Sequence, residues 1–89
     1  MSNQPSICIP RMQRYITRSD ILSIFNVCNF GKIKKINFTF KNKWKTAFIH
    51  FDCWYNNENE YRLKLLAGET IYIGYFAHPG FWKCCLNKN

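Results

Sequence analysis

Two adjoining segments with alternating apolar and polar residues place the strongest constraint on the fold of this chain. Within residues 32–40, Ile36, Phe38 and Phe40 alternate with the polar residues Lys35, Asn37 and Thr39. Successive side chains of a strand point to opposite faces, so this pattern predicts a strand with one buried face and one solvated face. Residues 44–51 repeat the pattern after a predicted turn at residues 41–43. The two strands should therefore form a hairpin.

A helix is predicted before this hairpin. Thr17 is a good N-cap, and Asp20, three residues later, is its acidic partner in the first turn. Ile16 and Ile21 have the spacing of a hydrophobic staple, and apolar residues continue at helical spacing as far as residue 28. Gly31 is the expected stop, because glycine tolerates the left-handed conformation that follows many helices.

A second helix and two more extended segments are predicted around and after the hairpin. Asn56 or Asn57 is the expected cap of the second helix, whose buried side should carry Tyr61, Leu65 and Leu66, and Gly68 should end it. Residues 6–10 alternate and then reach Pro10, which predicts a short first strand that ends at the proline. Residues 70–73 should be a short extended piece, and residues 81–86 the last strand.

The resulting order is strand, helix, strand, strand, helix, strand. Two βαβ halves of this kind predict an α+β, ferredoxin-like βαββαβ sandwich, with a four-stranded antiparallel sheet and both helices on one face. The 89 residues allow one domain, expected over residues 6–86, with flexible ends at residues 1–5 and 87–89. The core-facing strand residues should be Ile7, Ile9, Ala47, Ile49 and Phe51.

The segments 7–12 and 44–51 resemble the two sequence motifs of the RNA-recognition-motif (RRM) family. In that family aromatic side chains on the open sheet face stack against the bases of single-stranded RNA. The positions that correspond to the family's main aromatics hold Cys8, Thr46 and Phe48. The resemblance therefore implies the fold and an open binding face, but only one of the three usual stacking residues.

A narrower resemblance links the chain to short stand-alone RRM-like proteins of large nucleocytoplasmic DNA viruses. It rests on residues 6–11, the stretch from Ala47 to Trp54, Gly68 with Glu69, and residues 81–84. It implies a viral module located in the host cytoplasm or nucleus, or in the virion. Independently, the N-terminal residues lack the pattern of a signal peptide, which predicts an intracellular protein.

The charge of the chain favours polyanionic partners. Thirteen Lys and Arg stand against five Asp and Glu, which gives a formal charge of +8. Six lysines lie on residues 32–45, and Arg11, Arg14 and Arg18 lie near the end of the first strand. Such residues bind phosphates without reading sequence, although a merely soluble charged surface would have the same composition. A membrane is not an expected partner, because no basic helix with an apolar face is present.

Nothing in the sequence predicts catalysis, a cofactor or a small-molecule substrate. No phosphate loop, zinc-protease motif or hydrolase elbow occurs, and His50 has no acidic or nucleophilic neighbour in sequence. The five cysteines include no CxxC pair and are expected to be free thiols. A metal site built from Cys53, His78 and Cys84 or Cys85 matches no known zinc spacing, so no metal is expected.

Two hypotheses follow from these patterns. The first is a nucleic-acid-binding module that prefers single-stranded RNA, with DNA as the alternative, and has low sequence specificity. The second is a degenerate RRM that binds a protein partner through its helical face. The candidate nucleic-acid-binding residues are Cys8, Arg11, Lys35, Asn37, Lys43, Trp44, Lys45, Thr46, Phe48, His50 and Lys83. Trp44, Lys43 and Lys45 belong to the hairpin loop or its base, and Arg11 to the end of the first strand. The open sheet face itself should carry Cys8, Lys35, Asn37, Thr39, Thr46, Phe48, His50, Lys83 and Cys85.

Overall fold

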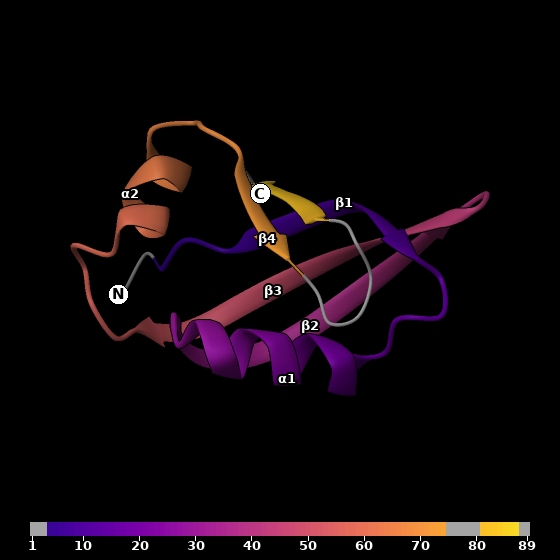
Figure 1. Ribbon diagram of the computed structural model, residues 1–89, viewed down its shortest axis with the longest axis horizontal. Coiled ribbons are helices and arrows are strands. Elements are labelled where there is room, and N and C mark those ends of the chain that lie inside the picture. The colour runs from indigo at the N-terminus through magenta and orange to yellow at the C-terminus, as the bar shows by residue number, and fades with distance from the viewer. Residues whose placement is uncertain (1–3, 75–80, 88–89) are drawn as a thin grey trace.

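The predicted hairpin is present, and its two strands are the longest of the sheet, with 11 residues each. The structure is a computed structural model and describes residues 4–74 and 81–87. Its elements are β1 (Ile7–Gln13), α1 (Arg18–Cys28), β2 (Gly31–Lys41), β3 (Trp44–Trp54), α2 (Glu60–Leu66), β4 (Ile71–Gly74) and β5 (Phe81–Leu86). The tip of the β2–β3 hairpin projects beyond α1 (Figure 1).

The sheet has five strands in the order β2-β3-β1-β5-β4, and every neighbouring pair is antiparallel. The prediction of a four-stranded sheet is therefore wrong in its strand count. The fifth strand is β4, the expected short extended piece, in which Tyr72 pairs with Lys83 of β5. The architecture is α+β and is broadly compatible with the predicted ferredoxin-like arrangement.

The core lies on one face of the sheet, and both helices contribute to it. All five predicted core-facing strand residues are buried; four of them (Ile7, Ile9, Ala47 and Ile49) have no exposed surface. An aromatic cluster joins the helices to the sheet. Phe25 of α1 packs edge-on against Phe51, and Tyr61 of α2 packs against Phe30 with 5.2 Å between ring centroids. The opposite sheet face carries neither helix.

The first strand does not end at Pro10. It continues to Gln13, because the β1–β3 register shifts between Ile9 and Met12, so that Pro10 and Arg11 lie in a bulge. A proline lacks the N–H that a regular ladder requires, and a bulge removes this requirement. Thr46 Oγ1 donates to the Pro10 carbonyl at 3.2 Å. The shift turns Met12 inward, where it is fully buried.

The ends of α1 confirm one prediction and correct another. Thr17 and Asp20 form the predicted capping box, with the Thr17 N–H donating to Asp20 Oδ2 at 2.9 Å. The left-handed residue after the helix is Asn29, with φ 56°, and not Gly31. Gly31 instead begins β2, where a Cβ atom would lie only 2.1 Å from the Cys53 carbonyl oxygen. This glycine is required by a close strand approach rather than by a helix end.

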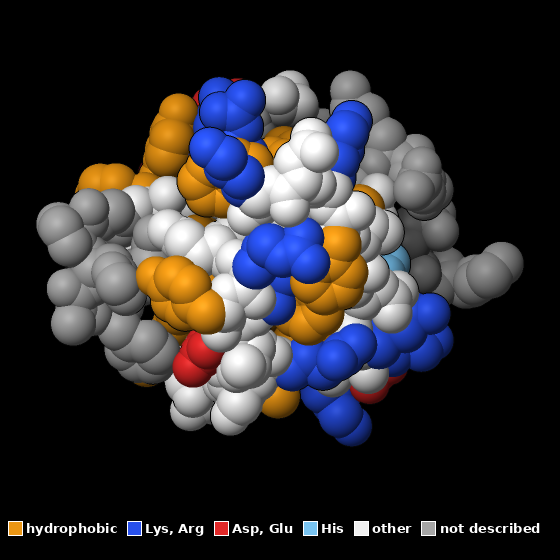
Figure 2. All heavy atoms as spheres, turned by 90° about the vertical axis from the view of Figure 1, so that its right-hand side faces the viewer, with side chains coloured by type: hydrophobic (Ala, Val, Ile, Leu, Met, Phe, Trp, Pro, Cys, Tyr) orange, Lys and Arg blue, Asp and Glu red, His pale blue; other side chains and the backbone are white. Residues whose placement is uncertain are grey.

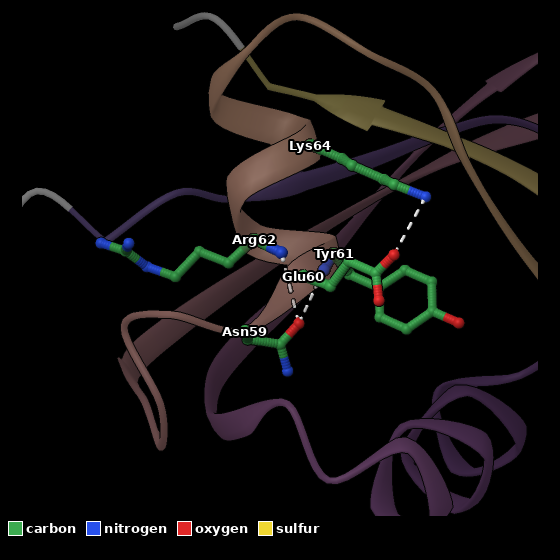
Figure 3. A network of polar contacts seen from close by, with 5 residues as sticks. All are labelled: Asn59, Glu60, Tyr61, Arg62 and Lys64. Carbon is green, nitrogen blue, oxygen red and sulfur yellow. Dashed lines mark hydrogen bonds and ion pairs between the residues drawn. The ribbon is translucent and has the colours of Figure 1, made fainter.

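Helix α2 begins later than predicted. Its N-cap is Asn59, whose side-chain oxygen accepts from the N–H groups of Tyr61 and Arg62 (Figure 3). Asn56 instead accepts from Glu58 N–H and so stabilises the preceding turn. Gly68, with φ 84°, follows the helix as predicted.

The predicted buried side of α2 is only partly correct. Leu65 is buried, but Tyr61 and Leu66 are 41% and 49% exposed. A helix of seven residues has only two turns, and one side of it reaches the sheet.

The segment before β1 packs on the domain from Gln4 onward. The side chain of Gln4 accepts from Trp54 N–H at 3.2 Å, and the Pro5 carbonyl accepts from the Trp54 indole at 3.0 Å. Pro5 is buried, so residues 4 and 5, which precede the predicted start of the domain at residue 6, pack against Trp54. At the other end, Asn87 N–H donates to the Ser6 carbonyl.

The close approach at Gly31 leads to a stability prediction. Gly31→Ala should lower the free energy of unfolding by about 1–3 kcal/mol, because the added methyl group meets backbone atoms that cannot move aside independently. Urea denaturation followed by circular dichroism measures this change. The control is Gly74→Ala, where the added Cβ would lie 3.8 Å from the Phe81 ring, an ordinary contact distance. Equal stability of the two variants would contradict the interpretation of Gly31.

Candidate nucleic-acid interface

The sheet face opposite the helices, here called the open face, is continuous across all five strands. Strand alternation and the cross-strand registers define its membership, because paired residues of antiparallel strands point to the same side. Phe48 lies near its centre, paired with Cys8 of β1 on one side and Asn37 of β2 on the other. Cys8 is in turn paired with Cys85 of β5. The open face also contains Ser6, Lys35, Thr39, Trp44, Thr46, His50, Tyr72, Phe81 and Lys83.

Most of the predicted site residues therefore share one surface. Cys8, Phe48, Thr46 and His50 are half-buried, whereas Lys35 and Asn37 are exposed. Trp44 is 42% exposed at the hairpin end of the same face, so it is not a core tryptophan. The other two tryptophans, Trp54 and Trp82, are buried.

The open face carries two aromatic residues that are absent from the predicted set. Tyr72 of β4 is 58% exposed and Phe81 of β5 is 71% exposed. A sequence signal for both is present: Ile71 and Ile73 alternate with Tyr72, and Trp82 and Cys84 alternate with Phe81 and Lys83. This alternation puts Tyr72 on the open face only if residues 70–73 form a strand of the sheet, which was not predicted from the sequence.

Lys45 does not belong to the open face. It is 5% exposed and lies on the helical side, between the inward-facing positions of Met12 and Ala47. Its Nζ donates to the Ile16 carbonyl oxygen and lies 4.1 Å from the centroid of the Phe38 ring. The alternation of β3 already implied this direction, since Lys45 shares the phase of Ala47 and Ile49. Lys45 stays a candidate cation, but the structure places it on the helical side of the sheet and not beside Phe48.

The remaining predicted cations lie on the open face or beside it. Arg11 and Lys83 line a depression of about 350 Å³ over β1 and β5, together with Pro10, Thr70 and Cys85. Lys35 lines a second depression of about 370 Å³, with Lys34, His50, Asp52 and other residues. Lys43 is exposed in the two-residue loop between β2 and β3. Cations therefore lie on both sides of the central Phe48.

The surroundings of His50 favour its neutral form. The Asn37 side-chain nitrogen lies 3.4 Å from Nε2, and Ser6 Oγ lies 3.0 Å from Nδ1. Burial lowers the pKa of His50 below its ordinary value of 6.5, and the charges of Lys35 and Lys34 lower it further. The residue therefore presents an uncharged, hydrogen-bonding edge at neutral pH.

The cysteines are free thiols in the structure. Burial, followed by the neighbouring Cys85 thiol, raises the pKa of Cys8 to about 11, so it is protonated at neutral pH and is a poor nucleophile. Within residues 4–74 and 81–87, no group of three His, Cys, Asp or Glu side chains is placed to hold a metal ion. His78, part of the metal alternative considered above, lies outside the described residues.

No family model, curated protein or solved structure matches this chain. Neither helix of the described part has the length and apolar character needed to cross a membrane, since α1 has 11 residues and α2 has seven.

The environment of His50 leads to a prediction for its titration. The midpoint of its ring-proton NMR shift should lie below 6.5, and Lys35→Ala should raise it, since one repelling charge is removed. Because the pKa of His50 is lower in the folded state than in the unfolded chain, the unfolded chain binds the proton at a higher pH. His50 therefore lowers stability as the pH falls below about 6.5 toward the folded pKa. Lys43→Ala, at the distant hairpin loop, should leave the midpoint unchanged; a midpoint at or above 6.5 in the wild type contradicts the prediction.

Proposed function

We propose that this chain is a single-stranded nucleic-acid-binding module of the RRM type, which prefers RNA and has low sequence specificity. Bases would stack on the open face, and phosphates would contact the cations around it. The proposal is a binding function without catalysis. The resemblance to short viral RRM-like modules agrees with it and supports no narrower biological role.

The observation that carries the proposal is the distribution of aromatic rings on the open face. Phe48, Trp44, Tyr72 and Phe81 come from β3, β4 and β5, and the last three are between 42% and 71% exposed. Large apolar rings on a surface that no helix covers have a free energy cost in water. Stacking of bases on such rings contributes about 1–3 kcal/mol per base and tolerates any base, because every base has a flat face.

The departure from the RRM pattern supports low specificity. Cys8 and Thr46 stand where the family has aromatic residues, so a base has only Phe48 to stack on at the centre of the sheet. Tyr72 and Phe81 provide rings nearer the β4 edge, on strands outside the two family motifs. The two polar side chains at the centre, Asn37 and His50, hydrogen-bond to each other, so they are less available to bind the edge of a base. Few groups are thus left to distinguish one base from another.

The charge distribution supports a polyanionic ligand. The two depressions on the open face contain Arg11 with Lys83 and Lys34 with Lys35. In the described residues the one ion pair is Lys64 with Glu60 on α2, at 3.6 Å and largely solvated (Figure 3). None of the open-face cations forms an ion pair within the described residues, although Asp52 lines the depression of Lys34 and Lys35. These cations would therefore release counterions on binding phosphates.

A second candidate function, a protein-interaction module, is favoured by the exposed apolar residues of the helices. Val27 of α1 is 83% exposed, Leu22 is 47%, and Leu63 of α2 is 50%. An apolar protein contact depends weakly on salt, whereas phosphate contacts weaken steeply as salt rises. Salt dependence therefore separates the two functions.

Fluorescence anisotropy with labelled single-stranded RNA and DNA tests the proposal. Tyr72→Ala should weaken binding by an amount equivalent to about 1–3 kcal/mol, as should Phe48→Ala, because each removes a stacking surface. The matched control is Tyr55→Ala, since Tyr55 is as exposed as Tyr72 (61% against 58%) but lies after β3, away from the open face. Equal effects of Tyr72→Ala and Tyr55→Ala, or binding that is independent of salt, would show that the open face is not the interface.

A further inference from the structure

Three cations and two aromatic rings converge on the helical side of the hairpin, outside the open face. This hairpin cation cluster consists of Arg14, Arg18, Phe38, Phe40 and Lys45. Arg14 follows β1, Arg18 begins α1, the two phenylalanines lie on β2, and Lys45 lies on β3. The end view of the molecule shows Lys and Arg side chains gathered around exposed hydrophobic side chains (Figure 2).

The cations are arranged around the two rings. The Arg14 guanidinium carbon lies 4.8 Å from the centroid of Phe40, and that of Arg18 lies 5.0 Å from the centroid of Phe38. Lys45 Nζ lies between the rings, 4.1 Å from Phe38 and 5.8 Å from Phe40. The ring faces attract each cation and so bring three positive charges close together.

Each cation is also fixed by a backbone carbonyl. Arg14 donates to the Asn42 oxygen at 2.9 Å, and Arg18 Nε donates to the Ile36 oxygen at 3.1 Å. Lys45 donates to the oxygen of Ile16. Long basic side chains on a surface usually sample many rotamers, and fixing them costs conformational entropy. In this cluster the side chains are already ordered in the free protein, so binding a ligand would cost little further conformational entropy.

The cluster lacks a compensating anion within the described residues. Asp20, the acid whose charge acts on Lys45, is engaged in the capping box of α1 with Thr17. Burial lowers the pKa of Lys45, the charges of Arg14 and Arg18 lower it further, and Asp20 only partly opposes them. A bound anion would offset the mutual repulsion of the three cations. The arrangement is therefore more favourable with an anion than without one.

We propose that Arg14, Arg18 and Lys45 form a binding site for a phosphate group, and that this phosphate belongs to a nucleic-acid strand. The two arginines present planar, multi-donor groups that suit phosphate oxygens, and both are exposed, whereas the buried Lys45 supplies charge from below. Phe40 is 59% exposed beside them and offers a surface to the adjoining sugar or base.

The choice of nucleic acid rests on the function proposed above. Trp44 lies on the open face at the same end of the hairpin, paired with Lys41, while the cluster lies on the other side of that end. A strand that leaves the open face past Trp44 would turn around the hairpin end and reach the cluster. The site would thus extend the bound length of the strand beyond the sheet.

The test compares Arg14→Ala/Arg18→Ala with a charge-matched control, Lys32→Ala/Lys64→Ala, whose residues are remote from the hairpin end. For an oligonucleotide long enough to pass the hairpin end, the arginine variant should bind at least about tenfold more weakly. Its slope of log affinity against log salt should become shallower by about 0.7 for each phosphate that the variant no longer neutralises. The control should retain both values. Binding by the arginine variant that matches the control overturns the inference and leaves the open-face proposal standing.

A second measurement keeps the inference testable if the variants fold poorly or if no oligonucleotide binds. Titration of the ¹⁵N-labelled wild-type protein with tripolyphosphate should shift the side-chain NMR signals of Arg14, Arg18 and Lys45 before those of Lys32 and Lys64. The absence of such shifts overturns the phosphate site itself. If the shifts occur but no oligonucleotide binds, the phosphate site is supported and the nucleic-acid function is wrong. Stronger binding to phosphatidylcholine–phosphatidylserine vesicles than to oligonucleotides would overturn the assignment to nucleic acid.

Discussion

The register of β3 is the constraint on which the rest of the structure depends. This strand pairs with both β1 and β2, and its inward residues Ala47, Ile49 and Phe51 meet the side chains of the first helix and the first strand. Because alternate residues of a strand point to opposite faces, burial of these three fixes Thr46, Phe48 and His50 on the open face. A slip by one residue would exchange the two sets and expose the core. The core and the candidate interface are therefore two consequences of one pattern of burial.

Much of the fold was predictable because its signals are local. The hairpin, the capping box of α1 and the inward strand residues each follow from side chains within a few positions of one another. Apart from the start of α2, the errors arose where a distant partner decides the local conformation. Pro10 continues a strand because β1 forms a bulge opposite Thr46, and Gly31 is needed because Cys53 approaches it. β4 became a fifth strand because β5 lies beside it.

The candidate interface was predictable to a similar degree and for similar reasons. Strand alternation alone predicts that Cys8, Thr46, Phe48 and His50 share one face, and the registers confirm it. The same alternation puts Lys45 in phase with Ala47, on the opposite side. The rings of Tyr72 and Phe81 join the open face through the pairing of β4 with β5, which no local pattern reveals. The hairpin cation cluster could not be predicted from the sequence either, because its three cations come from separate segments that the fold brings together.

The lysines of β2 have a consequence that is separate from any ligand. β2 is an outer strand of 11 residues, and its outer edge has peptide groups to which another extended chain could bind. Four lysines, at positions 32, 34, 35 and 41, lie along it. When two copies approach edge to edge, these like charges repel each other and oppose the growth of a shared sheet. The charge that would favour a polyanionic ligand thus also opposes edge-to-edge pairing of separate copies of the protein.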